Sequence, residues 1–158
     1  MPGEGRVAAM DYEALRAGIA DAVPYNAHLG LELLEVGDGR AVVRLPGGDH
    51  LDNHVGTWHA GGLFSAAEAA SGAAFVGGFA ERLGDITPLT RSANIEYTAL
   101  ARGPIDATAT LDEDAAVLLE RLDADGRVEF PVAIVLTDGD GKHVAEMTVT
   151  WNVRKNAS

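Results

Sequence analysis

Cysteine is absent from the 158 residues of this chain. Its absence excludes disulfide bonds, a catalytic thiolate and cysteine-ligated zinc, and it permits a reducing compartment. Several short motifs are absent as well: the sequence has no HExxH, no GxSxG elbow, no Walker-type loop and no GxGxxG. Zinc-protease, serine-hydrolase and nucleotide-binding activities therefore have no motif to support them.

Basic residues are scarce: 12 lysines and arginines face 24 acidic residues, so the formal net charge is -12. A field of this sign repels nucleic acid and anionic membrane surfaces, and we expect neither as a partner. Residues 1–10 contain a glutamate and lack the long apolar stretch of a secretory signal. We therefore predict a disordered tail over 1–10 and a cytoplasmic location.

The remainder has the composition of an ordinary globular protein, with 47% hydrophobic residues, and predicts a single domain over 11–158. Apolar spacing predicts a helix over 11–22 and a long helix from 60 to about 83. Extended segments are predicted at 31–36, 41–45, 90–100, 105–111, 117–122, 128–137 and 143–153. Glycine-rich and aspartate-rich turns at 37–39, 123–126 and 138–141 separate some of these segments and predict antiparallel hairpins. The fold class is therefore α+β, with an antiparallel sheet covering the long helix.

The stretch 60–80 has only one charged residue and is long enough to cross a bilayer. Most of its residues are alanine, glycine and serine, and Glu68 lies near its middle. Such a composition favours a central helix surrounded by protein over a membrane span.

Glu68 is the first candidate functional residue because it is the only ionisable side chain between His59 and Glu81. Burial disfavours the charged form of a carboxyl group and raises its pKa, which suits a general base or a nucleophile near neutral pH. The alternative is that Glu68 lies on an exposed stripe of the helix, and the sequence leaves both interpretations open.

The start of the long helix is the second candidate, because unpaired N–H groups and the positive end of the helix dipole can polarise a carbonyl group. A plain capped helix is the simpler alternative. The residues concerned are Asn53, Gly56, His59, Ala60, Gly61 and Gly62. His59 and Glu68 are nine residues apart, which on one helix corresponds to about 180° and about 13 Å. A site containing both therefore predicts a symmetric dimer in which a second copy supplies one of them.

Metal binding is the competing use of the loop before this helix. His50, His54 and His59 are spaced by four and five residues in a segment without predicted regular structure. This spacing does not match a zinc or iron site, so we expect no metal and no cofactor. Trp58, beside His59, is either a packing residue or part of a pocket wall.

The segment 53–72, NHVGTWHAGGLFSAAEAASG, resembles the signature of hot-dog-fold acyl-CoA thioesterases, in particular the phenylacetate-pathway type. The resemblance continues through 90–97, TRSANIEY, to 102–103 and covers most of the chain beyond residue 27. It implies a curved antiparallel sheet wrapped around one long helix. It also implies dimers formed by joining two sheets, or dimers of such dimers, with active sites at the dimer interface.

By the same resemblance, Glu68 is the general base or the nucleophile that attacks the thioester carbonyl. Gly61 donates its N–H to the carbonyl oxygen, whereas His59 and Asn53 orient the thioester or the water. Thr90 occupies the place of a residue that helps to position the nucleophilic water. Attack through water and direct attack by the carboxylate both stay open.

The resemblance also implies residues that contact the substrate. Arg102 and, more weakly, Arg91 are candidates for the phosphates of coenzyme A, which an acidic protein has to attract locally. The remaining candidates surround the helix start or the acyl group: Ala60, Gly62, Trp58 and Phe64. The sequence departs from the family pattern at Ala60, where a glycine is usual, and at Glu68, where this branch more often has aspartate.

The expected activity is hydrolysis of a medium-chain or aromatic acyl-CoA by a homo-oligomer. The main alternative is a non-catalytic acyl-CoA-binding or regulatory dimer that uses the same groove. A hot-dog dehydratase is a third possibility, but its usual arrangement of aspartate and histidine is not evident in this sequence.

Overall fold

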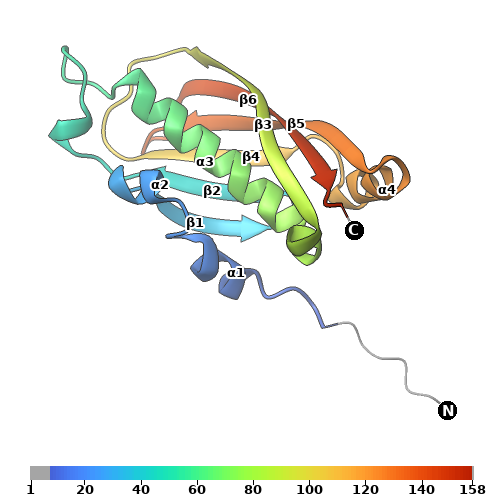
Figure 1. Cartoon of the computed structure of the whole chain (residues 1–158). Coiled ribbons are helices and arrows are strands. Elements are labelled where there is room, and N and C mark those ends of the chain that lie inside the picture. Colours follow the sequence, from blue (N-terminus) through green and yellow to red (C-terminus); the bar gives the residue numbers. More distant parts are fainter. Residues whose placement is uncertain (1–7, 158) are drawn as a thin grey trace.

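The computed structural model describes residues 8–157. Six antiparallel strands form one curved sheet in the order β1-β2-β4-β5-β6-β3, with α3 lying against it (Figure 1). The strands are β1 (Glu32–Gly37), β2 (Arg40–Leu45), β3 (Ile86–Tyr97), β4 (Ile105–Leu111), β5 (Arg127–Thr137) and β6 (His143–Lys155). The helices are α1 (Tyr12–Ile19), α2 (Pro24–His28), α3 (Ala60–Gly78) and α4 (Ala115–Asp125). The predicted α+β fold, a curved antiparallel sheet wrapped around one long helix, is confirmed.

Small side chains let α3 lie deep in the molecule. Ala66, Ala67, Ala70 and Ala74 are all 0% exposed, and the helix packs against β2, β4 and β5. A helix that is apolar on nearly all sides needs protein around it. The curved sheet covers the face that carries these alanines, whereas the face with Glu68, Gly72 and Val76 is only half-buried. Among the helices of residues 8–157, none combines the length and the apolarity that a bilayer crossing requires.

The end of α3 differs from the prediction. The helix ends at Gly78 rather than near residue 83, and a 3-10 segment, Ala80–Asp85, leads on to β3. Gly77 and Gly78 weaken the helix at this point because glycine has low helix propensity. Gly77 is needed for close packing, since a Cβ atom there would collide with the carbonyl oxygen of Gly37.

The prediction of a strand over 117–122 is wrong, because these residues belong to α4. The predicted tight turn over 123–126 is wrong for the same reason. Asp114 caps the start of α4 by accepting from the Ala116 N–H, and Gly126 ends it in the left-handed conformation with φ 74°. Leu118 and Leu122 lie on one face, four residues apart, and both are 0% exposed.

The helix predicted over 11–22 corresponds to α1, which ends at Ile19, and a second short helix, α2, begins at Pro24 beyond the predicted span. Asp11 caps α1 through a bond from the Ala14 N–H, whereas Pro24 begins α2 because its fixed φ suits a first helical position. Of the predicted disordered tail 1–10, residues 1–7 lie outside the described residues.

β3 forms one edge of the sheet and pairs only with β6 among the described strands. It is 12 residues long, and nearly all of its side chains are exposed or half-buried. Two large hydrophobic residues on it are open to solvent: Leu89 is 56% exposed and Tyr97 46%. Long, exposed edge strands with apolar side chains are sites for pairing with another chain.

We expect Gly77→Ala to lower the free energy of unfolding by about 1–3 kcal/mol, as overpacking against a rigid backbone does. The comparison is Gly84→Ala, where a Cβ atom meets nothing within 4 Å. That control is expected to stay within about 1 kcal/mol of the wild type. Urea denaturation of the three proteins measures the difference, and equal midpoints would contradict the close approach of α3 to Gly37.

Candidate active site

Glu68 is the ninth residue of α3 and is half-buried in the wall of a cavity of about 320 Å³. Of the described residues that line this cavity, Glu68 alone is ionisable and Asn26 is the one other polar side chain. Burial raises the pKa of the Glu68 carboxyl above its ordinary value. A carboxylate in such surroundings is more basic than one in water and can accept a proton near neutral pH.

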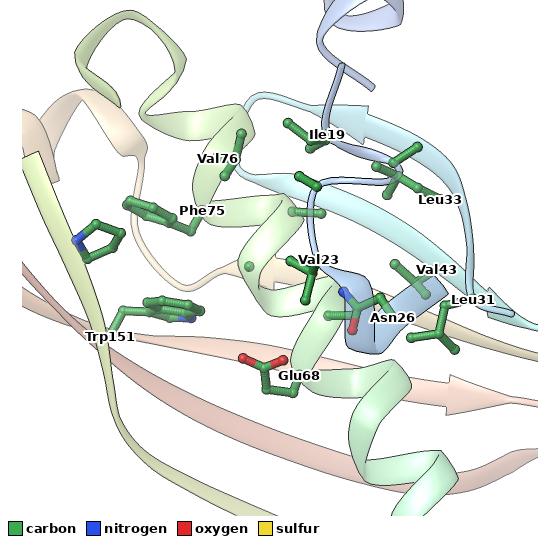
Figure 2. Close-up of a pocket in the computed structure, with 16 residues that line it drawn as sticks. Ile19, Val23, Asn26, Leu31, Leu33, Val43, Glu68, Phe75, Val76 and Trp151 are labelled. Atoms are coloured by element: carbon green, nitrogen blue, oxygen red, sulfur yellow. The ribbon is translucent and has the colours of Figure 1, made fainter. Parts of the chain in front are cut away.

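The other cavity walls come from segments far apart in the chain. Figure 2 shows Trp151 and Phe75 on one side of Glu68, and Val23 and Asn26 on another. The indole of Trp151 is fixed in place because its Nε1 donates to Ser71 Oγ at 3.2 Å and its ring stacks on Phe75 with centroids 5.4 Å apart. Sequence reasoning missed these walls. The alternation of apolar and polar residues over 147–153 is the sequence signal that would have placed Trp151 on the face of the sheet toward α3.

His59 is the N-cap of α3 and lies well away from Glu68 on the same helix. Its Nδ1 accepts a hydrogen bond from the Gly61 N–H at 2.8 Å, and its carbonyl oxygen accepts from the Gly62 N–H at 2.9 Å. Within a single protomer, the Gly61 N–H therefore donates to the imidazole of His59. The resemblance assigns this N–H to the substrate carbonyl. The helix rise separates residue 59 from residue 68 by about 13 Å.

Asn53 makes four side-chain hydrogen bonds inside its own loop. Its Oδ1 accepts from the N–H groups of Val55 and Thr57, and its Nδ2 donates to Thr57 Oγ1 and to the Trp58 carbonyl. A primary amide has two donors and two acceptor positions, so the side chain is saturated. The geometry thus makes Asn53 the residue that holds the loop in front of α3, whereas the resemblance implies direct contact with thioester or water.

The expected substrate-binding residues at the helix start do not line the Glu68 cavity. Trp58 is 5% exposed and donates from Nε1 to the Gly103 carbonyl at 2.6 Å, which ties the loop to the segment before β4. Gly62 is buried and Phe64 packs partly against the core. Ala60 is exposed, and its carbonyl accepts from the Tyr97 hydroxyl at 3.0 Å.

Thr90 lies on β3 directly opposite Trp151 of β6. Paired residues in an antiparallel sheet project from the same face, so Thr90 is on the side of the sheet that carries the wall of the cavity. Pro88, two residues earlier on β3, lines the cavity as well. Thr90 itself is exposed and does not line the cavity, so its expected role in positioning water stays a prediction.

The two arginines expected to meet coenzyme A lie apart. Arg102 is exposed beside the loop, where its Nη1 donates to the Gly56 carbonyl at 2.6 Å. Arg91 is exposed on β3 and forms an ion pair with Glu129 of β5. Neither lines the cavity, and only Arg102 is close to the start of α3. Within residues 8–157, no three histidine or carboxylate side chains are grouped as a metal site would require.

Fold and site together define a thioesterase-like protein of the hot-dog superfamily. The chain belongs to the family described as a domain of unknown function, DUF4442, which matches residues 12–153. The comparison with curated proteins gave no match. The phenylacetate-pathway subtype stays a prediction.

Solved structures give the same assignment of the fold. A Pseudomonas aeruginosa protein described as a probable thioesterase is 28% identical with a TM-score of 0.81, covering 91% of this chain and 95% of its own. A second protein from that organism, described as a conserved protein, is 28% identical with a TM-score of 0.67 and covers 83% and 94%. A variant of a Staphylococcus aureus thioesterase is 18% identical with a TM-score of 0.67 and covers 84% and 99%.

We expect Asn53→Asp to lower the free energy of unfolding by about 1–3 kcal/mol. The carboxylate cannot donate a hydrogen bond to Thr57 Oγ1 or to the Trp58 carbonyl oxygen. Its negative charge also repels these two oxygens. Asn94→Asp is the matched control, because Asn94 is exposed on β3. Urea denaturation compares the two variants, and equal midpoints would show that the loop does not depend on the amide.

We expect Glu68→Gln to be more stable than the wild type at neutral pH, by about 1–3 °C in Tm. The raised pKa means that folding disfavours the ionised carboxylate, so the wild type loses stability as the pH rises through the carboxyl range. Glutamine does not titrate. The difference in Tm should therefore shrink as the pH falls below the ordinary glutamate pKa of about 4.3. Thermal melts over a pH series test this, and a difference that is constant with pH would contradict it.

Proposed function

We propose that this protein is an acyl-CoA thioesterase that works as a homodimer, with Glu68 of one protomer acting beside the start of α3 of the other. The observation that carries the proposal is Glu68 itself, the one ionisable group among the described residues lining an apolar cavity. The thioesterase description of a relative that is 28% identical over 91% of the chain supports the same reaction.

The need for a partner follows from the length of α3. The Gly61 amide at the helix start is seven residues from Glu68, about 10 Å along the axis, which is too far for both to contact one thioester. A two-fold axis can bring Glu68 of one protomer to the helix start of the other. β3 supports this arrangement, because pairing of two β3 edges would satisfy its open backbone groups and cover Leu89 and Tyr97.

In the proposed reaction, the Glu68 carboxylate accepts a proton from a water molecule. The oxygen of that water forms a bond to the thioester carbonyl carbon, and the carbonyl oxygen gains negative charge beside the amides of the partner's helix start. The C–S bond then breaks, and the proton on Glu68 is transferred to the departing sulfur. The products are the free acid and coenzyme A. The raised pKa of Glu68 strengthens the carboxylate both as a base and as a nucleophile, so direct attack on the carbonyl carbon is the alternative path.

Two features near the start of α3 bear on how acyl-CoA would bind: the hydrogen bond between Gly61 and His59, and the exposed Arg102. The Gly61 N–H must leave His59 Nδ1 before it can donate to the substrate, so His59 is proposed to turn away when the thioester arrives. Arg102, exposed beside the same loop, is proposed to bind a phosphate of coenzyme A. Arg91 is less suited to that role because Glu129 already neutralises it.

The occupied Gly61 N–H and the saturated Asn53 favour the second candidate function, a dimer that binds acyl-CoA without hydrolysis. In such a protein the helix start stays capped by His59 and the thioester remains intact. Retention of acyl-CoA with no release of coenzyme A would identify it.

Subunit complementation tests the shared site. Glu68→Gln removes the base and Gly61→Asp puts a negative charge where the carbonyl oxygen should gain its own. We expect each variant alone to lose at least about a hundredfold in kcat. Refolding the two together in equal amounts should restore about a quarter of wild-type turnover, since half of the dimers are mixed and each mixed dimer has one intact site.

The matched control for the carboxylate is Glu120→Gln, an exposed glutamate on α4, which should keep wild-type turnover. Full activity of Glu68→Gln would remove Glu68 from the mechanism. No recovery on mixing, with both variants folded and dimeric, would place the whole site within one protomer. Absence of coenzyme A release by the wild type from any thioester would favour the binding protein.

A further inference from the structure

Building on the proposed function, we propose that the acyl group is an unbranched chain of about eight to ten carbons. It lies along α3 from Glu68 to Val76 beneath the N-terminal helices, and residues 72 and 76 set its length. This selects medium-chain acyl groups over the aromatic ones that the sequence left open.

The floor of the cavity is a row of side chains on one face of α3. Glu68, Gly72 and Val76 are spaced four residues apart, which places them one above another on a helix. All three line the cavity, together with Ala69 and Ala73 on the same face. A Cβ atom on Gly72 would meet the Trp151 ring at 3.7 Å, so this glycine lets the indole lie close to the helix. The small Ala69 and Ala73 line the cavity beside it, and the larger Val76 follows at the far end.

The length of this row defines how far a chain can extend. Eight residues separate Glu68 from Val76, a rise of about 12 Å. A C–C bond of about 1.52 Å in an extended chain advances about 1.3 Å per carbon, so about nine carbons fit between them. A phenylacetyl group extends only about 6 Å beyond its carbonyl carbon on the same bond lengths and would end near Gly72.

The chemistry of the walls fits an apolar chain. Figure 2 shows Glu68 at one end of the cavity residues and Val76 with Ile19 at the other, and Val23, Leu31 and Leu33 form the facing side. No residue of α1 or α2 is fully buried, and Tyr12, Leu15 and Ile19 of α1 pack partly against the core. Ile19 and Asn26 of these helices line the cavity, so the two helices cover this space. Asn26 is the one polar side chain on the covering side among the described residues.

The test is a chain-length profile of the full-length protein with straight-chain acyl-CoAs from butanoyl to hexadecanoyl and with phenylacetyl-CoA. We expect kcat/KM to rise about fourfold per methylene up to eight to ten carbons, as burial of successive CH2 groups predicts, and to fall beyond. Gly72→Leu should move the optimum to about four or five carbons, because residue 72 is about 6 Å from residue 68. Val76→Phe should shorten the optimal chain length by only about two carbons, because residue 76 lies at the far end of the cavity.

The matched controls place the same side chains outside the cavity. Gly84→Leu, where a Cβ atom has open space, and Val117→Phe, on exposed α4, should keep the wild-type profile. A profile without a medium-chain optimum, preference for phenylacetyl-CoA, or identical shifts in Gly72→Leu and Val76→Phe would overturn the inference.

Measurements of acyl-CoA binding distinguish a failure of this inference from a failure of the proposed function. The Kd values of the same acyl-CoA series for the Glu68→Gln protein should show the same optimum and the same shifts when Gly72→Leu or Val76→Phe is added. If the profile appears in binding but no thioester is hydrolysed by the wild type, the cavity is assigned correctly and the proposed reaction is wrong. If hydrolysis occurs without any dependence of Kd or kcat/KM on chain length, the reaction stands and the inference fails.

Discussion

Packing of an alanine-rich helix into the curve of an antiparallel sheet is the constraint on which the rest of this molecule depends. Ala66, Ala67, Ala70 and Ala74 are completely buried, so the sheet approaches α3 closely along its length. A glutamate placed on such a helix is surrounded by apolar side chains wherever the sheet and the N-terminal helices cover it. The chemistry attributed to Glu68 therefore follows from the packing of the helix and not from a dedicated loop.

The sequence predicted most of the fold because its signals were local. The small-residue helix, the turn at 37–39 and the turn at 138–141 lie where expected, and the paired strands around them were identified. The error at 117–122 has a clear cause. A short apolar run between an aspartate and a glycine is compatible with a hairpin strand and equally with a helix capped at both ends. Burial of Leu118 and Leu122 decides in favour of the helix, and burial is a tertiary property.

The candidate site was predictable only in part. Glu68 could be singled out because its isolation in an apolar segment is visible in the sequence. The cavity wall could not, since Val23, Asn26 and Trp151 come together only when the two ends of the chain pack over α3. The hydrogen bonds of Asn53 also needed coordinates, because the four bonds that its amide makes inside the loop cannot be read from the sequence. Its expected contact with the thioester or the water stays a prediction.

Under the proposed dimeric site, the open edge of β3 would make catalysis depend on protein concentration. If pairing of two such edges completes each site, the folded chain at great dilution has a base without an oxyanion pocket, and protein concentration becomes part of the rate law. Dissociation would then silence the enzyme while every strand and helix stays intact. Cells holding this protein near its dimer dissociation constant would tune hydrolysis simply through its abundance.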